Sequence, residues 1–219
     1  IEEIGGLTRA FGKAATRARL AGFDGVEIHG AFGYLVDQFL RDGSNRRTDD
    51  YGGCVENRAR FLFGVISAAQ QSFGRNVGVK LSPASRAHGM SDSHTEATFG
   101  EVLSLLNGAD LAYVHMMEPL PGDDSPEPLM LATNAFARKH YTGTLIANGG
   151  FSAETATGLI GGGGADLVSF GQHFIANPDL PARFRSGGAM AAPDFASVYG
   201  IPGQPLESGY TDYPAAALP

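Results

Sequence analysis

Short runs of apolar residues, each followed by glycine or polar residues, recur along most of the chain and predict strands. They lie at 25–28, 77–82, 111–116, 144–147 and 166–170. Apolar residues are nearly continuous within these runs rather than alternating with polar ones. That pattern is typical of parallel strands buried on both faces of a sheet. We therefore expect five parallel strands.

Between the strands, apolar residues recur at helical spacing. The pattern predicts helices over 7–20, 55–72, 94–106, 127–139, 152–160 and 179–186, with short helices after Leu35 and after residue 170. Strands that alternate with helices indicate βα units and an α/β fold. Five strands cannot close an eight-stranded barrel. The sheet is therefore either open and doubly wound, or the larger part of a (β/α) barrel.

The length of 219 residues is enough for one domain with a sizeable core. We expect a single domain over 1–219, with a Pro- and Ala-rich C-terminal extension from about residue 188. Because the chain opens on Ile1 rather than Met, we also expect a fragment or a processed chain.

Composition narrows the possible functions. The net charge of −7 argues against nucleic-acid binding, which needs a basic surface. No apolar run reaches the roughly 18 residues of a membrane span, so we expect no membrane partner. The single cysteine, Cys54, fits a reducing, cytoplasmic compartment. The histidines show no metal-ligand spacing, so no metal site is predicted.

The clearest candidate chemistry follows the first strand, where the chain turns on Gly30 and Gly33. In α/β proteins the carboxyl ends of parallel strands are where ligands bind. His29 there can donate a hydrogen bond to a carbonyl oxygen, and Tyr34 can deliver a proton. The alternative is a packed turn in which both side chains are structural.

Glycines at two later strand ends indicate a possible phosphate site. Gly149 and Gly150 follow one strand, and Gly171-Gln172 follows the next. Glycine allows backbone N–H groups to approach a phosphate closely. The alternative is a pair of tight turns.

Charged residues offer two further interpretations. Lys80 lies in an otherwise apolar strand, so it needs an anionic partner, either a bound ligand or an internal carboxylate. The arginines of the 41–53 segment, Arg41, Arg46 and Arg47, lie among aspartates, which favours a salt-bridged loop.

Several segments together resemble the old yellow enzyme family. They are Gly25–Arg41 with the adjoining Ser44-Asn45, Asp49–Gly53, Glu56–Arg58, Val77–Pro83, Ala176–Leu180 and Gly209–Pro214. They follow the family's order over nearly the whole chain. The match begins at the family's fourth strand, so the resemblance implies a (β/α)8 TIM-type barrel of which this chain carries about five βα units, the fourth to the eighth.

The resemblance also implies a reaction. Members of this family contain FMN and reduce the C=C bond of α,β-unsaturated carbonyl compounds with NADH or NADPH. In that reaction His29 binds the substrate oxygen and Tyr34 protonates the α-carbon. The substrate site would include Phe32 and Tyr199, and the flavin site Lys80, Gly149, Gly150, Gly171 and Gln172.

Three positions depart from the family pattern. Phe32 stands where a second donor to the substrate oxygen is usual, and Lys80 and Gln172 stand where arginines are usual. These departures support an alternative, a truncated member with weak or no FMN binding that serves as a binding or interaction subunit or as a flavin-free isomerase. In either case the open edges of a five-stranded sheet predict self-association or a partner chain that supplies the missing strands.

Overall fold

The computed structural model describes residues 1–119 and 132–216. These residues form two compact units. The first comprises Ile1–Gly150 and Ala156–Val168, and the second comprises Phe151–Thr155 and the chain from Ser169 onward. The single domain expected over 1–219 stays a prediction.

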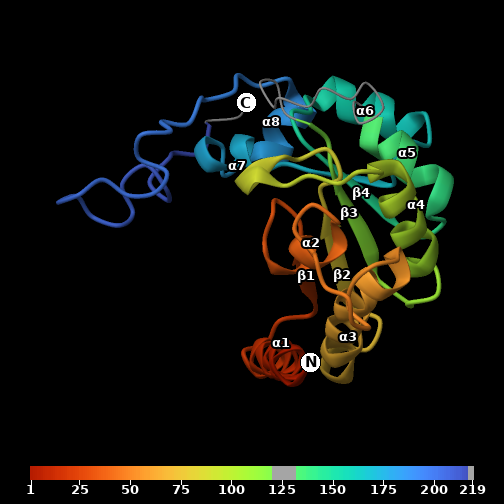
Figure 1. The fold of residues 1–219 in the computed structure, drawn as a ribbon. Coiled ribbons are helices and arrows are strands. Elements are labelled where there is room, and N and C mark those ends of the chain that lie inside the picture. The colour runs from red at the N-terminus through yellow and green to blue at the C-terminus, as the bar shows by residue number, and fades with distance from the viewer. Residues whose placement is uncertain (120–131, 217–219) are drawn as a thin grey trace. The chain divides into compact units, whose positions relative to one another are not determined.

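The first unit is built on a sheet whose strands follow one another in chain order. The strands are β1 (Val26–Gly30), β2 (Val77–Leu81), β3 (Tyr113–Met117), β4 (Leu145–Asn148) and β5 (Leu167–Ser169). The pairs β1–β2, β2–β3 and β3–β4 are parallel. The five predicted strands and the α/β class are therefore confirmed (Figure 1).

Helices occupy the segments between the strands. They are α1 (Glu2–Leu20), α2 (Leu35–Leu40), α3 (Val55–Phe73), α4 (Thr95–Leu106), α5 (Thr133–His140) and α6 (Ala153–Gly161), followed in the second unit by α7 (Gln172–Ala176) and α8 (Leu180–Ser186). The first part of the helix predicted at 127–139 lies outside the described residues, and α5 confirms the rest. None of the helices in the described part of the chain is long and apolar enough to span a membrane.

The start predicted for the first helix, residue 7, was wrong. The helix begins at Glu2, and Glu2 and Glu3 occupy its first turn. Carboxylates there interact favourably with the positive end of the helix dipole. Gly5 and Gly6 hid this turn from the sequence pattern because glycine is a poor helix former.

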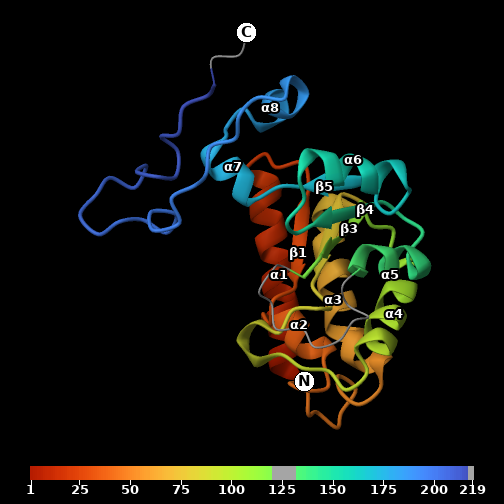
Figure 2. The same cartoon turned by 90° about the horizontal axis from the view of Figure 1, so that it is seen from above.

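One face of the sheet forms the hydrophobic core together with the helices. Ile28, Val79 and Val114 are neighbours across β1, β2 and β3, and all three are buried. Outside this layer, α1 lies beside α3 in both views (Figures 1 and 2), with the rings of Phe11 and Phe61 6.1 Å apart. The core therefore fixes the direction of the strands and of the turns that follow them.

The opposite face of the sheet is polar. His29, Lys80 and His115 are neighbours across the same three strands, one position beyond the apolar layer. Glu27 and His29 are exposed, so the expectation that both faces are buried does not hold for β1. The strands β1, β2 and β3 thus carry polar side chains on the face away from the helices.

The turn after β1 is fixed by a buried ion pair within α2. Arg41 Nε donates to Asp37 Oδ1 over 2.8 Å, and both side chains are almost completely buried. The remaining guanidinium nitrogens donate to the carbonyls of Ser82 and Pro83, at the end of β2. Arg41 is thus salt-bridged, as expected of these arginines, but its partner is Asp37 of α2 and not one of the aspartates among which the arginines lie. The expected pairing within the segment was right for Arg47, which pairs with Asp49.

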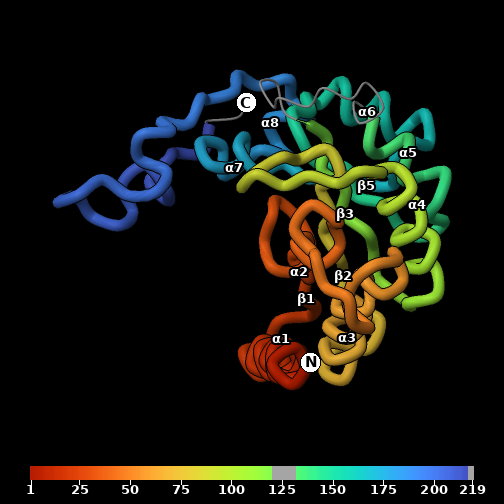
Figure 3. Tube along the Cα trace, in the orientation of Figure 1, coloured from red at the N-terminus to blue at the C-terminus, as the bar shows by residue number. Residues whose placement is uncertain are grey.

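The segment between β2 and α4 completes this region. The tube in Figure 3 follows it (yellow) away from the sheet and back to α4. A short 3-10 turn, Ala87–Gly89, packs against the turn after β1, where a Cβ on Gly33 would lie 2.7 Å from the Ala87 carbonyl oxygen. Glycine at position 33 is therefore required by close packing as well as by its φ of +75°.

We predict that R41M destabilises the protein by about 3–5 kcal/mol, because it leaves the Asp37 carboxylate buried without its partner. Urea unfolding at pH 8 measures the loss. Burial already raises the pKa of Asp37, against the opposing effect of Arg41. The loss should shrink at pH 5, where Asp37 without Arg41 takes up a proton.

R47M is the matched control, because Arg47 also pairs with an aspartate but at the surface. Its urea midpoint should stay close to that of the parent chain. Equal losses for the two variants would contradict the role given to the buried pair.

Candidate active site

His29 lies on the polar face of β1, and Tyr34 lies beside it in the turn that follows this strand. Their ring centres are 5.3 Å apart, and the Tyr34 side chain is 54% exposed. Partial burial, and secondarily the charge of Lys80, lower the pKa of His29, against smaller opposing effects of Glu27 and Asp37. At neutral pH His29 is therefore a neutral imidazole with one N–H to donate.

The backbone between these two residues is held by Ser82, which follows β2, and by Asp37 of α2. The Phe32 N–H donates to Ser82 Oγ over 2.7 Å, and the Gly33 N–H donates to Asp37 Oδ2 over 2.9 Å. Phe32 has a φ of 56°, in the left-handed region that non-glycine residues rarely adopt. The Phe32 ring stacks on His29, with 6.0 Å between ring centres. In this conformation the side chains of His29 and Tyr34 lie close to each other at the end of β1.

A polar cluster, formed by Glu27, Tyr113 and His115, adjoins His29 on the face of the sheet. His115 Nδ1 lies 2.9 Å from Glu27 Oε2. Burial raises the pKa of Glu27, but the hydrogen bond and charge of His115, with help from Tyr113 and Lys80, lower it overall. Burial and the Glu27 carboxylate raise the pKa of Tyr113 to about 12. Sequence reasoning missed this cluster, although Glu27 lies two residues before His29 and therefore shares its face of the strand.

Lys80 is paired with an amide rather than a carboxylate. Its Nζ donates to Asn148 Oδ1 over 3.3 Å, and it lies 5.8 Å from the centre of the Phe32 ring. Burial lowers the pKa of Lys80, and the nearby Glu27 opposes that effect. No ion pair of Lys80 within 4 Å is found among residues 1–119 and 132–216. A partly buried ammonium with a neutral partner fits an anionic ligand on this face.

The glycines after β4 also fit a cofactor. Gly149 has a φ of 117°, and a Cβ on it would lie 2.9 Å from the Glu118 carbonyl oxygen. Gly150 has a φ of 66°, and no heavy atom of the described residues lies within 4 Å of where its Cβ would be. Gly149 is thus required by packing, whereas Gly150 leaves open space beside the backbone. Such space allows a phosphate or a flavin ring to approach.

The other predicted ligand-binding residues belong to the second unit. Gly171 and Gln172 form the start of α7, with Gln172 its first residue. Tyr199 is 99% exposed. These three residues lie in the second unit, whereas His29, Tyr34 and Lys80 lie in the first. Their roles remain predictions.

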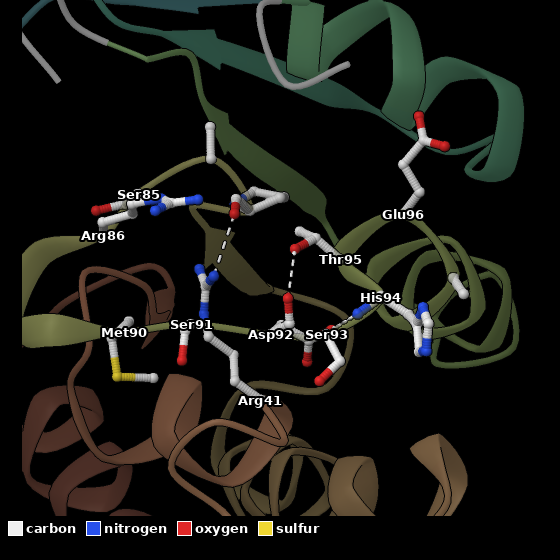
Figure 4. Close-up of a pocket in the computed structure, with 13 residues that line it drawn as sticks. Arg41, Ser85, Arg86, Met90, Ser91, Asp92, Ser93, His94, Thr95 and Glu96 are labelled. Atoms are coloured by element: carbon white, nitrogen blue, oxygen red, sulfur yellow. Dashed lines mark hydrogen bonds between the residues drawn. The ribbon is translucent and has the colours of Figure 1, made fainter. Parts of the chain in front are cut away.

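A pocket of about 400 Å³ lies between the β2–α4 segment and the start of α4. Figure 4 shows the Arg41 side chain reaching toward it, with Asp92 and Thr95 on its wall. Asp92 also accepts a hydrogen bond from Arg58 over 3.0 Å. The pocket lining includes none of the predicted site residues, so we assign the chemistry to the face of the sheet.

The charges beside His29 generate a prediction. K80M should raise the pKa of His29 because it removes a positive charge that disfavours the imidazolium. E27Q should lower it because it removes a negative charge that favours the imidazolium. Both shifts can be followed by NMR titration of the His29 ring. K13M, on the exposed side of α1, is the control and should leave the titration unchanged. Shifts of the same sign in K80M and E27Q would contradict this electrostatic account.

Comparisons with known proteins identify the family of this chain. The family model described as "NADH:flavin oxidoreductase / NADH oxidase family" matches residues 1–190. A putative 12-oxophytodienoate reductase 10 of Oryza sativa subsp. japonica is 42% identical, over 97% of this chain and 68% of that protein. A probable flavin mononucleotide-dependent alkene reductase of Leishmania infantum is 41% identical, over 97% of this chain and 56% of that protein.

A solved structure is similar over the same region. The old yellow enzyme homologue from Zymomonas mobilis is 38% identical and has a TM-score of 0.90, over 99% of this chain and 60% of that one. This confirms the resemblance and the partial barrel inferred from it. The chain thus spans somewhat more than half the length of most relatives it matches. The chain belongs to the NADH:flavin oxidoreductase / NADH oxidase family, the family of the old yellow enzymes.

Proposed function

We propose that this chain carries the proton-transfer site of a flavin-dependent oxidoreductase. The reaction is reduction of the C=C bond of an α,β-unsaturated carbonyl compound, with NADH or NADPH as the reductant. The main observation in support of this proposal is the contact between His29 and Tyr34 at the end of β1, with 5.3 Å between ring centres. Membership in a family of flavin oxidoreductases supports the reaction class.

The residues present fit FMN, which when bound supplies a hydride to the substrate. Lys80 offers a partly buried positive charge whose protein partner is a neutral amide, and Gly149 and Gly150 leave the backbone after β4 accessible. We assign Gly171 and Gln172 to the phosphate on the sequence resemblance. Lysine offers a point charge where arginine offers two parallel donors, so we expect weaker flavin binding than in the relatives.

His29 has the role of holding the substrate oxygen. Its low pKa keeps the ring neutral, so one ring N–H donates to the carbonyl oxygen while the other nitrogen carries a lone pair. Negative charge develops on that oxygen when the β-carbon accepts a hydride. A fixed donor stabilises this charge more than it stabilises the neutral carbonyl, which lowers the barrier.

Tyr34 has the role of proton donor to the α-carbon. Its ring lies beside that of His29, and the residue is about half exposed. Phe32 contributes an apolar ring beside His29 instead of a second donor, and Tyr199 of the second unit is assigned to the substrate site on the sequence resemblance. We therefore expect an enone-type substrate with an apolar group near its carbonyl.

We also propose that the chain self-associates or pairs with a partner chain that completes the barrel, and that it is cytoplasmic. The five strands support the first proposal, because a family barrel has eight. The single cysteine supports the second. Size-exclusion chromatography with light scattering tests the association, and a monodisperse 23 kDa monomer would contradict it.

The first experiment is an absorption spectrum of the purified protein before and after addition of FMN. We expect a flavin band that NADH or NADPH bleaches under anaerobic conditions and that an enone such as 2-cyclohexenone restores. A colourless protein that takes up no FMN would overturn the proposal. In that case, enone isomerisation without flavin, or binding of a partner chain, becomes the function to test.

Two substitutions separate the proposed roles. H29L, which has no donor at this position, should lower the rate of enone-dependent flavin reoxidation by about 10²–10³, the usual effect of removing one oxyanion donor. Y34F should lower the rate of product formation by about 10²–10⁴, the range for a general acid. Both variants should keep the flavin content of the parent protein. H94L, which changes an exposed histidine outside the proposed site, should keep the parent rates, and unchanged rates in H29L would refute the role given to His29.

A further inference from the structure

Tyr34 contacts a second imidazole besides that of His29. His88, in the 3-10 turn between β2 and α4, lies with its ring centre 5.2 Å from that of Tyr34, edge to face. Its side chain is exposed. The sequence alone did not single out His88, which lies 54 residues beyond Tyr34 in an irregular segment. The packing of the two turns brings this third proton-handling group to the site.

The orientation of the His88 ring is defined by the backbone. His88 Nδ1 lies 2.8 Å from the carbonyl oxygen of Phe32. A carbonyl oxygen only accepts hydrogen bonds, so Nδ1 carries the hydrogen. The other nitrogen, Nε2, is therefore the one that gains and loses a proton when the ring titrates.

This arrangement is held in place by unusual backbone conformations on both sides. Phe32 and His88 have φ values of 56° and 58°, both in the left-handed region. Non-glycine residues persist there where the surrounding structure enforces the conformation, and such residues gather at functional sites. Here the enforcement is close packing, because a Cβ on Gly33 would lie 2.7 Å from Met90 Cγ. The contact of His88 with Tyr34 is thus a fixed feature of the two turns.

We propose that His88 relays protons from solvent to Tyr34 in each turnover, an assignment that rests on the proposed function. When Tyr34 protonates the α-carbon, its O–H bond breaks and a phenolate remains. Protonated His88 then gives the Nε2 proton to the phenolate oxygen through one intervening water, and Nδ1–H stays on the Phe32 carbonyl. The neutral imidazole takes a replacement proton from bulk water at Nε2. No electrons are exchanged in these steps.

Within the described part of the first unit, charged and titratable groups lie on both sides of this relay. Arg86 precedes His88 on the same segment and is exposed. On the facing turn, His29 lies beyond Tyr34, and the buried Asp37 accepts the Gly33 N–H. Lys80 acts on His29 from β2. His88 is therefore an exposed titratable group whose ring contacts Tyr34 directly.

The first test needs no flavin. Selective ¹³C labelling of tyrosine Cζ reports the environment of the Tyr34 hydroxyl by NMR, with Y34F identifying the resonance. The titration is run in H29N, which removes the other neighbouring imidazole. We expect a step in the Tyr34 shift as His88 titrates, and loss of the step in H29N/H88N but not in H29N/H94N. A step that survives H88N would overturn the inference.

The second test uses the flavin-loaded protein. Asparagine can still donate to the Phe32 carbonyl but cannot relay protons, so H88N should preserve the turn and flavin content. We expect H88N to slow enone-dependent turnover by about tenfold or more and added imidazole to restore it, as expected for a lost proton relay. Y34F should show no such rescue. Parent rates in H88N, or slow rates that imidazole does not restore, would overturn the relay.

The two tests keep the inference separate from the proposed function. A protein that takes up no FMN but shows the His88-dependent step refutes the ene-reductase function while supporting the proton link between His88 and Tyr34. A flavin-loaded, active protein in which H88N changes neither the Tyr34 titration nor the rate refutes the relay and supports the function.

Discussion

The buried guanidinium of Arg41 is the constraint on which the site depends. Its donors reach Asp37 within α2 and the carbonyls of Ser82 and Pro83 at the end of β2. Asp37 in turn accepts the Gly33 N–H. One ion pair therefore joins the turn after β1 to the end of the neighbouring strand. A buried charge needs all of its partners in place, so the turn has little freedom to shift while the pair exists.

The two faces of the sheet beside this turn have different roles. The face toward the helices supplies the apolar core, and the other face carries the titratable side chains of Glu27, Lys80 and His115. Partly buried charges that neighbour one another adjust their protonation together. Burial lowers the pKa of His29 most, Lys80 lowers it further, and the carboxylate of Glu27 opposes both effects. The proton state of the site thus depends on side chains that are not part of the turn.

The strands, and the proximity of His29 and Tyr34 at the end of β1, were predictable from sequence because their signals are local. A buried apolar run followed by Gly30 and Gly33 identifies a strand and its exit, and with it His29 and Tyr34. The Glu27–His115 contact joins residues 88 positions apart, and it follows from the parallel register rather than from any local pattern. His88 was missed for a similar reason, because a loop that packs on another loop leaves no periodic trace.

The partner of Arg41 shows how a correct local principle can still select the wrong residue. A charged segment rich in aspartate favours ion pairs, and Arg47 does pair with Asp49 there. Arg41 instead pairs with Asp37, four residues earlier on the same helix, because that carboxylate is buried with it. Burial decides whether an arginine pairs with one carboxylate or another nearby, and composition does not reveal which carboxylates are buried. The same applies to Lys80, for which the sequence allowed a carboxylate or a ligand and the structure provides the amide of Asn148.

Phe32 illustrates how the turn tolerates change without loss of geometry. Both of its backbone hydrogen bonds, to Ser82 Oγ and from His88 Nδ1, are independent of the Phe32 side chain. A side chain at this position can therefore change from a hydrogen-bond donor to an apolar ring while His29 and Tyr34 keep their places. In the proposed reaction, what changes is the chemistry next to the substrate oxygen, since an aromatic ring offers packing where a donor would offer charge stabilisation. The proposed role of stabilising that oxygen consequently rests on His29, whose neutral state Lys80 helps to maintain.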